Sequence, residues 1–160
     1  MQRLNFRVIK FCQDNKLTMA FAESVTCGLA AHQLSQVKGT SEAFKGSLVC
    51  YNGDVKTSLL KIPKAMIDKF TAESQQVTDA MAKKLKRLIN ADVYAAITGL
   101  ASEGGSETKT KPVGTIFFSV LYKNKLFRQR KLFRGNALEI KKKACDELYS
   151  FIISSVSKTL

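Results

Sequence analysis

Residues 17–28 read LTMAFAESVTCG, an uncharged apolar run that passes directly into polar and small residues. A short apolar run of this kind predicts a buried β-strand over residues 17–22. The residues that follow predict a tight turn and then a helix from about Thr26 to Gln36. A strand that leads straight into a helix is the building unit of α/β domains, so this stretch indicates the fold class.

The same alternation of strands and helices continues along the rest of the chain. Apolar runs predict strands over residues 46–51, 92–98, 113–122 and 125–133. Helical periodicity predicts helices near residues 4–14, 54–61, 63–70, 75–90 and 137–155. The last two strands are separated by two residues only, so they must pair antiparallel. We therefore expect an α/β fold, a single-domain three-layer α/β/α sandwich with a mixed sheet of about five strands, over residues 1–160.

The charge of the chain is strongly positive. Twenty-six Lys and Arg residues against 13 Asp and Glu residues give a formal net charge of +13. A field of this sign attracts anions such as phosphorylated metabolites, nucleic acid or acidic lipid, and it does not choose among them. An ordinary lysine-rich surface explains the charge equally well.

Other features limit the class of protein. No apolar run approaches the roughly 18–20 residues of a membrane span, so no membrane partner is expected. Residues 1–16 are typical of an amphipathic helix and not of a signal peptide. The four cysteines, Cys12, Cys27, Cys50 and Cys145, show no zinc-ligand spacing, and reduced thiols in a cytoplasmic protein without a metal are the expectation.

Polar residues that suit chemistry follow three of the predicted strands. Ligands of α/β sheets collect in the loops at the strand carboxyl ends, here Ser24–Gly28, Tyr51–Lys56 and Gly99–Pro112. In the first loop, a hydroxyl beside free helix amides suits either a nucleophile next to an oxyanion site or a simple helix cap, and the pattern alone favours the cap. The glycines of the third loop suit either a phosphate cradle or a flexible connection.

A serine nucleophile needs a base, and the single histidine is badly placed for it. His32 lies eight residues after Ser24, roughly 10 Å along a helix, so we expect it to be exposed or partly packed. Cys27 is expected to be a buried small apolar residue. The remaining bases are Lys56 and Tyr51, and a lysine can act as a base only where burial or nearby positive charge lowers its pKa. Because the chain has 26 basic residues, a lysine that could lie near Ser24 is a weak signal by itself.

Three short motifs occur in order at the three strand ends. Residues 22–28, AESVTCG, compare with A-E-S-C-T-G-G, and residues 51–56, YNGDVK, keep the Tyr-to-Lys spacing of Y-S-N-x-x-K. Residues 99–115 keep parts of G-I-A-G-P-x-G-G-(S/T) and then K-P-V-G-T. With these motifs, most of the chain resembles the CinA C-terminal domain family, the nicotinamide-nucleotide amidases.

The resemblance implies a function and a set of site residues. It implies hydrolysis of the carboxamide of nicotinamide mononucleotide by the nucleophile Ser24, with Tyr51 and Lys56 moving the proton, and without a metal or cofactor. It also implies a small-molecule nucleotide as partner, a homodimer, and the three-layer fold. The residues expected to hold substrate or oxyanion are Glu23, Thr26, Gly28, Gly99, Ala101, Gly104, Gly105 and Ser106.

The sequence departs from the family pattern around the substrate. Val25 and Cys27 replace a cysteine and a glycine, and Asn136-Ala137 stand where the family often has G-D-R after Gly135. Two alternatives therefore stay open, a catalytically decayed domain that binds a nucleotide or protein partner, and a basic nucleic-acid-binding protein that uses residues 125–134. The amidase hypothesis predicts a buried Lys56 whose amine meets the hydroxyls of Ser24 and Tyr51 within about 3–4 Å.

Overall fold

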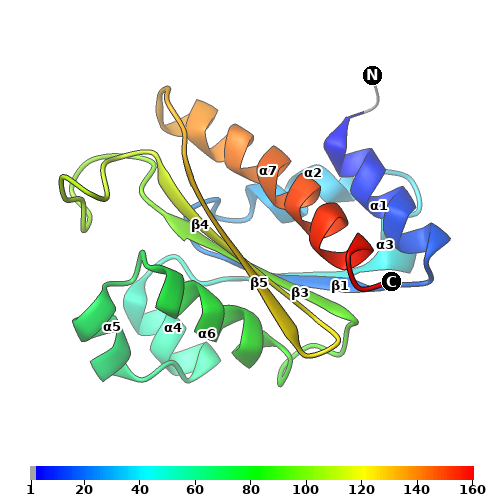
Figure 1. Ribbon diagram of the computed structural model, residues 1–160, viewed down its shortest axis with the longest axis horizontal. Helices are drawn as coiled ribbons and strands as arrows, with labels where there is room; N and C mark the ends of the chain where they lie inside the picture. Colours follow the sequence, from blue (N-terminus) through cyan, green and yellow to red (C-terminus); the bar gives the residue numbers. More distant parts are fainter. Residues whose placement is uncertain (1–2) are drawn as a thin grey trace.

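The computed structural model describes residues 3–160, which build one mixed sheet with strand order β2-β1-β3-β4-β5 (Figure 1). The strands are β1 (Met19–Glu23), β2 (Phe44–Val49), β3 (Val93–Gly99), β4 (Thr115–Tyr122) and β5 (Lys125–Leu132). Strand β1 runs parallel to β2 and β3, whereas β4 is antiparallel to β3 and β5. The predicted mixed sheet and its closing hairpin are confirmed.

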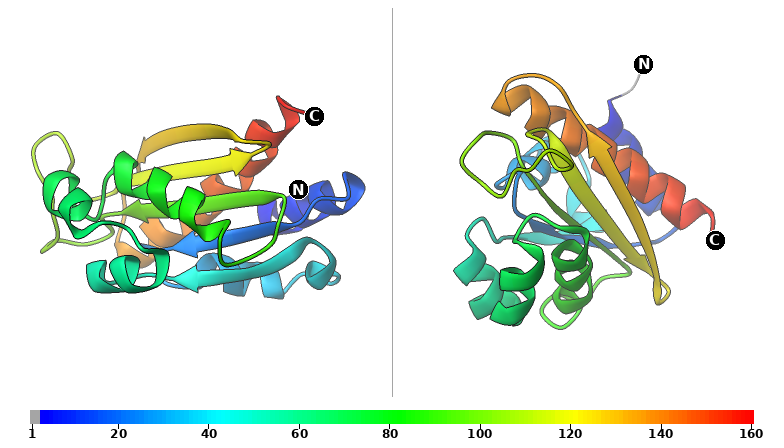
Figure 2. Two further views of the ribbon diagram at one scale, coloured as in Figure 1. Left: turned by 90° about the horizontal axis from the view of Figure 1, so that it is seen from below. Right: turned by 60° about the vertical axis from the view of Figure 1, so that its left-hand side comes forward.

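Helices cover both faces of the sheet and complete three layers, as predicted (Figures 1 and 2). One face carries α1 (Leu4–Asp14), α2 (Leu29–Ser35), α3 (Thr40–Ala43) and α7 (Ala137–Ser157). The other face carries α4 (Gly53–Leu60), α5 (Lys64–Phe70) and α6 (Gln75–Leu85). Among the described helices, none has the length and hydropathy to cross a bilayer.

The central position of β1 in the sheet explains why the strand carries no charged residue before Glu23. All five of its residues are buried, because β1 lies between two strands and beneath helices on both faces. Successive side chains alternate between the faces, so Phe21 joins the core under α1 and α7 while Ala20 and Ala22 join the core under α6. Phe21 also packs on Phe44 with a ring-centroid distance of 4.9 Å.

The element boundaries differ from prediction at two places that matter for the site. Helix α2 begins at Leu29 and not near Thr26, because Cys27 and Gly28 adopt positive φ angles of 49° and 89° in a turn before it. Strand β2 ends at Val49, so Tyr51 lies in the connection to α4. The carboxyl ends of the parallel strands β1, β2 and β3 meet at one edge of the sheet, which brings the loops that follow them together (Figure 2).

The buried aromatic side chain of β1 gives a test of this core. Phe21→Ala should lower the free energy of unfolding by about 3–5 kcal/mol, because it removes a fully buried ring and leaves a cavity. Phe6→Ala, at a partly exposed position of α1, is the control and should cost far less. Urea unfolding followed by circular dichroism measures both, and equal losses would contradict the assignment of Phe21 to the core.

Candidate active site

Ser24 is held in place by the strand that precedes it and the turn that follows it. Its amide donates to the Ile97 carbonyl of β3 at 3.0 Å, and its carbonyl accepts from the Cys27 amide at 3.0 Å. The residue is nearly buried and contributes to the wall of a cavity. These backbone bonds fix the direction of the Ser24 side chain at the end of β1.

Glu23 organises the turn from inside the protein. Its side chain is fully buried, and its carboxylate accepts five hydrogen bonds of 2.7–3.1 Å, from the hydroxyls of Thr26 and Ser47 and from the amides of Gly28, Ala30 and Ala31. The carboxylate therefore caps the start of α2 and ties it to β2. Glu23, Thr26 and Gly28, expected to hold substrate, use these groups within the protein and lie outside the cavity wall.

Lys56 reaches the Ser24 hydroxyl from the side of the sheet that carries α4. It lies in the first turns of α4, a helix that begins with the Asn52 side chain accepting from the Asp54 amide. The Lys56 side chain is fully buried, and its Nζ lies 2.9 Å from Ser24 Oγ. The predicted burial of Lys56 and its contact with Ser24 are both confirmed.

The surroundings of Lys56 suit a neutral amine. Burial lowers the pKa of Lys56 below the ordinary lysine value, and the nearby Glu73 carboxylate opposes this only in part. The carbonyls of Cys50 and Tyr51 accept from Nζ at 2.8 and 3.4 Å. A neutral amine has two N–H groups and one lone pair, so these carbonyls can take both hydrogens while the lone pair faces the Ser24 hydroxyl. This arrangement can accept a proton from Ser24.

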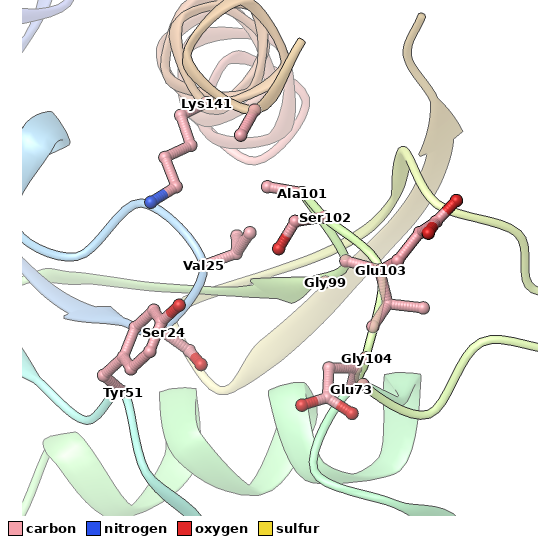
Figure 3. Close-up of a pocket in the computed structure, with 13 residues that line it drawn as sticks. Ser24, Val25, Tyr51, Glu73, Gly99, Ala101, Ser102, Glu103, Gly104 and Lys141 are labelled. Carbon is pink, nitrogen blue, oxygen red and sulfur yellow. The ribbon is translucent and has the colours of Figure 1, made fainter.

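The Tyr51 side chain lines the cavity wall beside Ser24 (Figure 3). Tyr51 is 61% exposed, and it contacts Lys56 through its backbone carbonyl. Among the described residues, its hydroxyl takes part in no hydrogen bond, and its ring lies 5.9 Å from the amine of Lys141. Of the three side chains expected to meet, Ser24 and Lys56 are therefore in direct contact, and the part of Tyr51 in this group stays a prediction.

The cavity has a volume of about 240 Å³ and is built from five separate segments. Beside Ser24, Val25 and Tyr51, it is lined by Glu73 before α6, by residues 99–105 after β3, and by Ala137 and Lys141 of α7 (Figure 3). Gly99, Ala101, Gly104 and Gly105, expected to bind substrate, line this cavity together with Ser102 and Glu103 of the same loop. Glu73 and Lys141 were not expected here. Glu73 and Lys141 lie outside the three motifs, so no sequence signal indicated them.

The loop of residues 99–112 after β3, here called the glycine loop, is held by hydrogen bonds from its own side chains. The amides of Gly104 and Gly105, expected to hold a nucleotide, each donate at 2.8 Å to the Glu107 carboxylate. Ser106, which lies outside the cavity wall, donates to the Glu73 carboxylate. Lys111 Nζ donates at 2.7 Å to Ser106 Oγ. The loop is therefore tied to the segment before α6.

Two other candidate residues, His32 and Cys27, lie outside the cavity wall. His32 is exposed and bonds to the Gln36 side chain at 3.2 Å, in agreement with its predicted exclusion as a base. Cys27 is exposed, so the prediction that it is buried is wrong. The reason is the left-handed turn at Cys27, which replaces the expected first turn of the helix. Within residues 3–160, no group of three or more His, Cys, Asp or Glu side chains is arranged to hold a metal.

The fold and the contact between Ser24 and Lys56 define an α/β domain with a buried serine–lysine pair, and comparison with known proteins gives its family. The sequence model of the CinA C-terminal domain matches residues 1–156. The CinA-like protein of Prochlorococcus marinus is 36% identical over 157 residues, which are 94% of this chain and 36% of that protein. The chain belongs to the CinA C-terminal domain family, and it spans about a third of the length of the curated relatives it matches.

Solved structures of the same superfamily share the fold. The competence/damage-inducible protein CihA of Agrobacterium tumefaciens superposes with a TM-score of 0.88 at 26% identity, over 94% of this chain and 92% of that one. A CinA superfamily protein of Klebsiella pneumoniae gives a TM-score of 0.91 at 22% identity, over 97% and 96%. The three-layer architecture is thus common to this chain and these proteins.

The carboxylate of Glu23 offers a test of how the site is held. Glu23→Ala should lower the free energy of unfolding by about 3 kcal/mol or more, because it leaves buried donors without an acceptor. Glu42→Ala, which removes an exposed carboxylate of α3, is the control and should cost about 0.5 kcal/mol or less. Chemical unfolding of the two variants decides this, and a stable Glu23→Ala protein would refute the capping role.

Proposed function

We propose that this chain is an amidohydrolase that converts nicotinamide mononucleotide to nicotinate mononucleotide and ammonia. The observation that carries the proposal is the 2.9 Å contact between Ser24 Oγ and the buried amine of Lys56. A fully buried lysine is costly unless its charge is relieved, and a lowered pKa beside a hydroxyl in a cavity is typical of a catalytic base. Membership of the CinA family supports the choice of substrate.

In the proposed reaction, Ser24 Oγ attacks the carboxamide carbon while Lys56 Nζ accepts the hydroxyl proton. The ammonium of Lys56 gives this proton to the carboxamide nitrogen as the C–N bond breaks. Ammonia departs, and the acyl group stays on Ser24 as an ester. A water then attacks the ester carbon and gives its proton to Lys56. Lys56 returns the proton to Ser24 Oγ as the C–O bond breaks, which releases the nicotinate product.

The backbone next to Ser24 offers donors for the oxyanion. The amides of Val25 and Thr26 donate to no group within the described residues, and Val25 lines the cavity. Amides that follow a nucleophile and point to the developing charge are the usual oxyanion site. Of the residues that the family resemblance implied for this role, the proposal keeps the Thr26 amide and adds that of Val25, because the Gly28 amide is bonded to Glu23.

The nucleic-acid alternative gains no support from the surface that suggested it. Arg128 of β5 forms an ion pair with Asp79, and Arg130 lies over the ring of Phe117 at 5.6 Å. The aromatic residues of the stretch, Phe127 and Phe133, are partly buried against the core. The stretch therefore has part of its charge and its aromatic rings engaged within the protein, where single-strand binding needs both to be free.

Ammonia release from nicotinamide mononucleotide tests the amidase directly. Ser24→Ala and Lys56→Met should each lower kcat by about 10³-fold or more, because one removes the nucleophile and the other the base. Ser58→Ala and Lys45→Met, exposed residues of the same types, are matched controls and should keep the wild-type rate. Binding of the nucleotide without ammonia release by the wild type would instead favour the decayed, ligand-binding alternative.

The pH dependence of the reaction should report the state of Lys56. The neutral amine is the active form, so kcat/KM should rise with pH up to the pKa of Lys56 and then level off. Because burial lowers the pKa of Lys56, the midpoint should lie below the ordinary value of about 10.4. A rate profile from acidic to alkaline pH checks this, and a rate that is constant across that range would count against Lys56 as the base.

A further inference from the structure

The charges that line the cavity are separated into two ends. Lys141 of α7 is the cation of the cavity wall, whereas the carboxylates Glu73 and Glu103 lie at the other end, and Ser24 and Ser102 lie between them (Figure 3). Within the described residues, the amine of Lys141 forms no hydrogen bond and no ion pair. Its charge is therefore available to a ligand in the cavity.

The amides of Gly104 and Gly105 at the glycine end of the cavity are already bonded to a carboxylate. The carboxylate of Glu107 accepts both of these hydrogen bonds. They hold the pKa of Glu107 below its usual value. Glu107 is therefore ionised at neutral pH. A substrate phosphate at these amides would have to displace one carboxylate and approach Glu73 and Glu103, which repel it.

At the other end of the cavity, the Lys141 amine is accessible to an anion. Lys141 is half-buried, and its amine lies 5.9 Å from the centroid of the Tyr51 ring, a contact that favours a cation at this place. Ala137 precedes Lys141 by four residues and so lies on the same face of α7. Because Ala137 carries only a methyl group, space remains beside the amine.

We propose that Lys141 binds the anionic group of the substrate and that Tyr51 forms the wall between this group and the carboxamide at Ser24. This inference rests on the proposed function, because it assigns the place of the substrate phosphate in the same site. The phosphate lies at α7 and not at the glycine loop. Lys141 is then a specificity-determining residue, and Glu107 closes the alternative subsite.

Binding to the full chain with Ser24→Ala, which does not consume the ligand, tests the assignment. The probes are nicotinamide mononucleotide and nicotinamide riboside, which differ by the phosphate, and calorimetric titration gives each Kd. Adding Lys141→Ala should raise the Kd of the mononucleotide about 10- to 100-fold, the effect of losing one charge-assisted hydrogen bond. The Kd of the riboside should stay within about twofold. Adding Lys142→Ala is the matched control, since this neighbouring lysine is exposed, and it should change neither Kd.

Several results would overturn the inference. These are an unchanged Kd for the mononucleotide in Lys141→Ala, an equal loss in Lys142→Ala, an equal loss for the riboside, or no binding of the mononucleotide before Lys141 is changed. Tighter binding in Glu107→Gln, together with no effect of Lys141→Ala, would place the phosphate at the Gly104 and Gly105 amides instead.

The amidase proposal fails separately from this one. A wild-type protein that binds the mononucleotide through Lys141 and releases no ammonia refutes the reaction and keeps the subsite. A wild-type protein that releases ammonia with the same KM as Lys141→Ala keeps the reaction and refutes the subsite. In an active enzyme, Lys141→Ala should raise KM far more than it lowers kcat, because it changes binding and leaves Ser24 and Lys56 intact.

Discussion

The burial of one amine, that of Lys56, is the constraint around which the site is arranged. An amine enclosed by protein must be neutralised or well bonded. Here the carbonyls of Cys50 and Tyr51 and the hydroxyl of Ser24 surround Nζ. These partners come from the ends of β1 and β2, while the lysine comes from α4. The contact exists only when the parallel strands are in register and α4 begins where Asn52 caps it.

A buried carboxylate complements the buried amine from the other side of β1. Glu23 precedes Ser24 in the chain, and its five hydrogen bonds fix the turn, the start of α2 and the neighbouring strand. In the proposed reaction a rigid turn matters, because a nucleophile displaced by about 1 Å loses much of its rate advantage. The replacement of a family glycine by Cys27 is accommodated in this turn by an exposed side chain and a left-handed backbone.

Local placement, and not total charge, gives the basic residues their different roles. Of 26 lysines and arginines, Lys56 is buried beside a hydroxyl, Lys111 ties the glycine loop to the segment before α6, and Lys141 lines the cavity. The net charge of +13 draws anions toward the molecule as a whole. In our proposal, Glu73, Glu103 and Glu107 decide at which end of the cavity an anion binds.

The amino-acid sequence determined the order of strands and helices along the chain, and its three motifs, through their family resemblance, led to the expected pairing of Ser24 with Lys56. Burial imposes a periodicity on each element, and the motifs occupy strand ends that a parallel sheet must bring together. Only the tertiary structure decided that Tyr51 lines the wall, that Glu23 caps α2, and that Glu73 and Lys141 lie on the same cavity. These facts depend on side-chain directions and on contacts between remote segments, which neither periodicity nor motif spacing encodes.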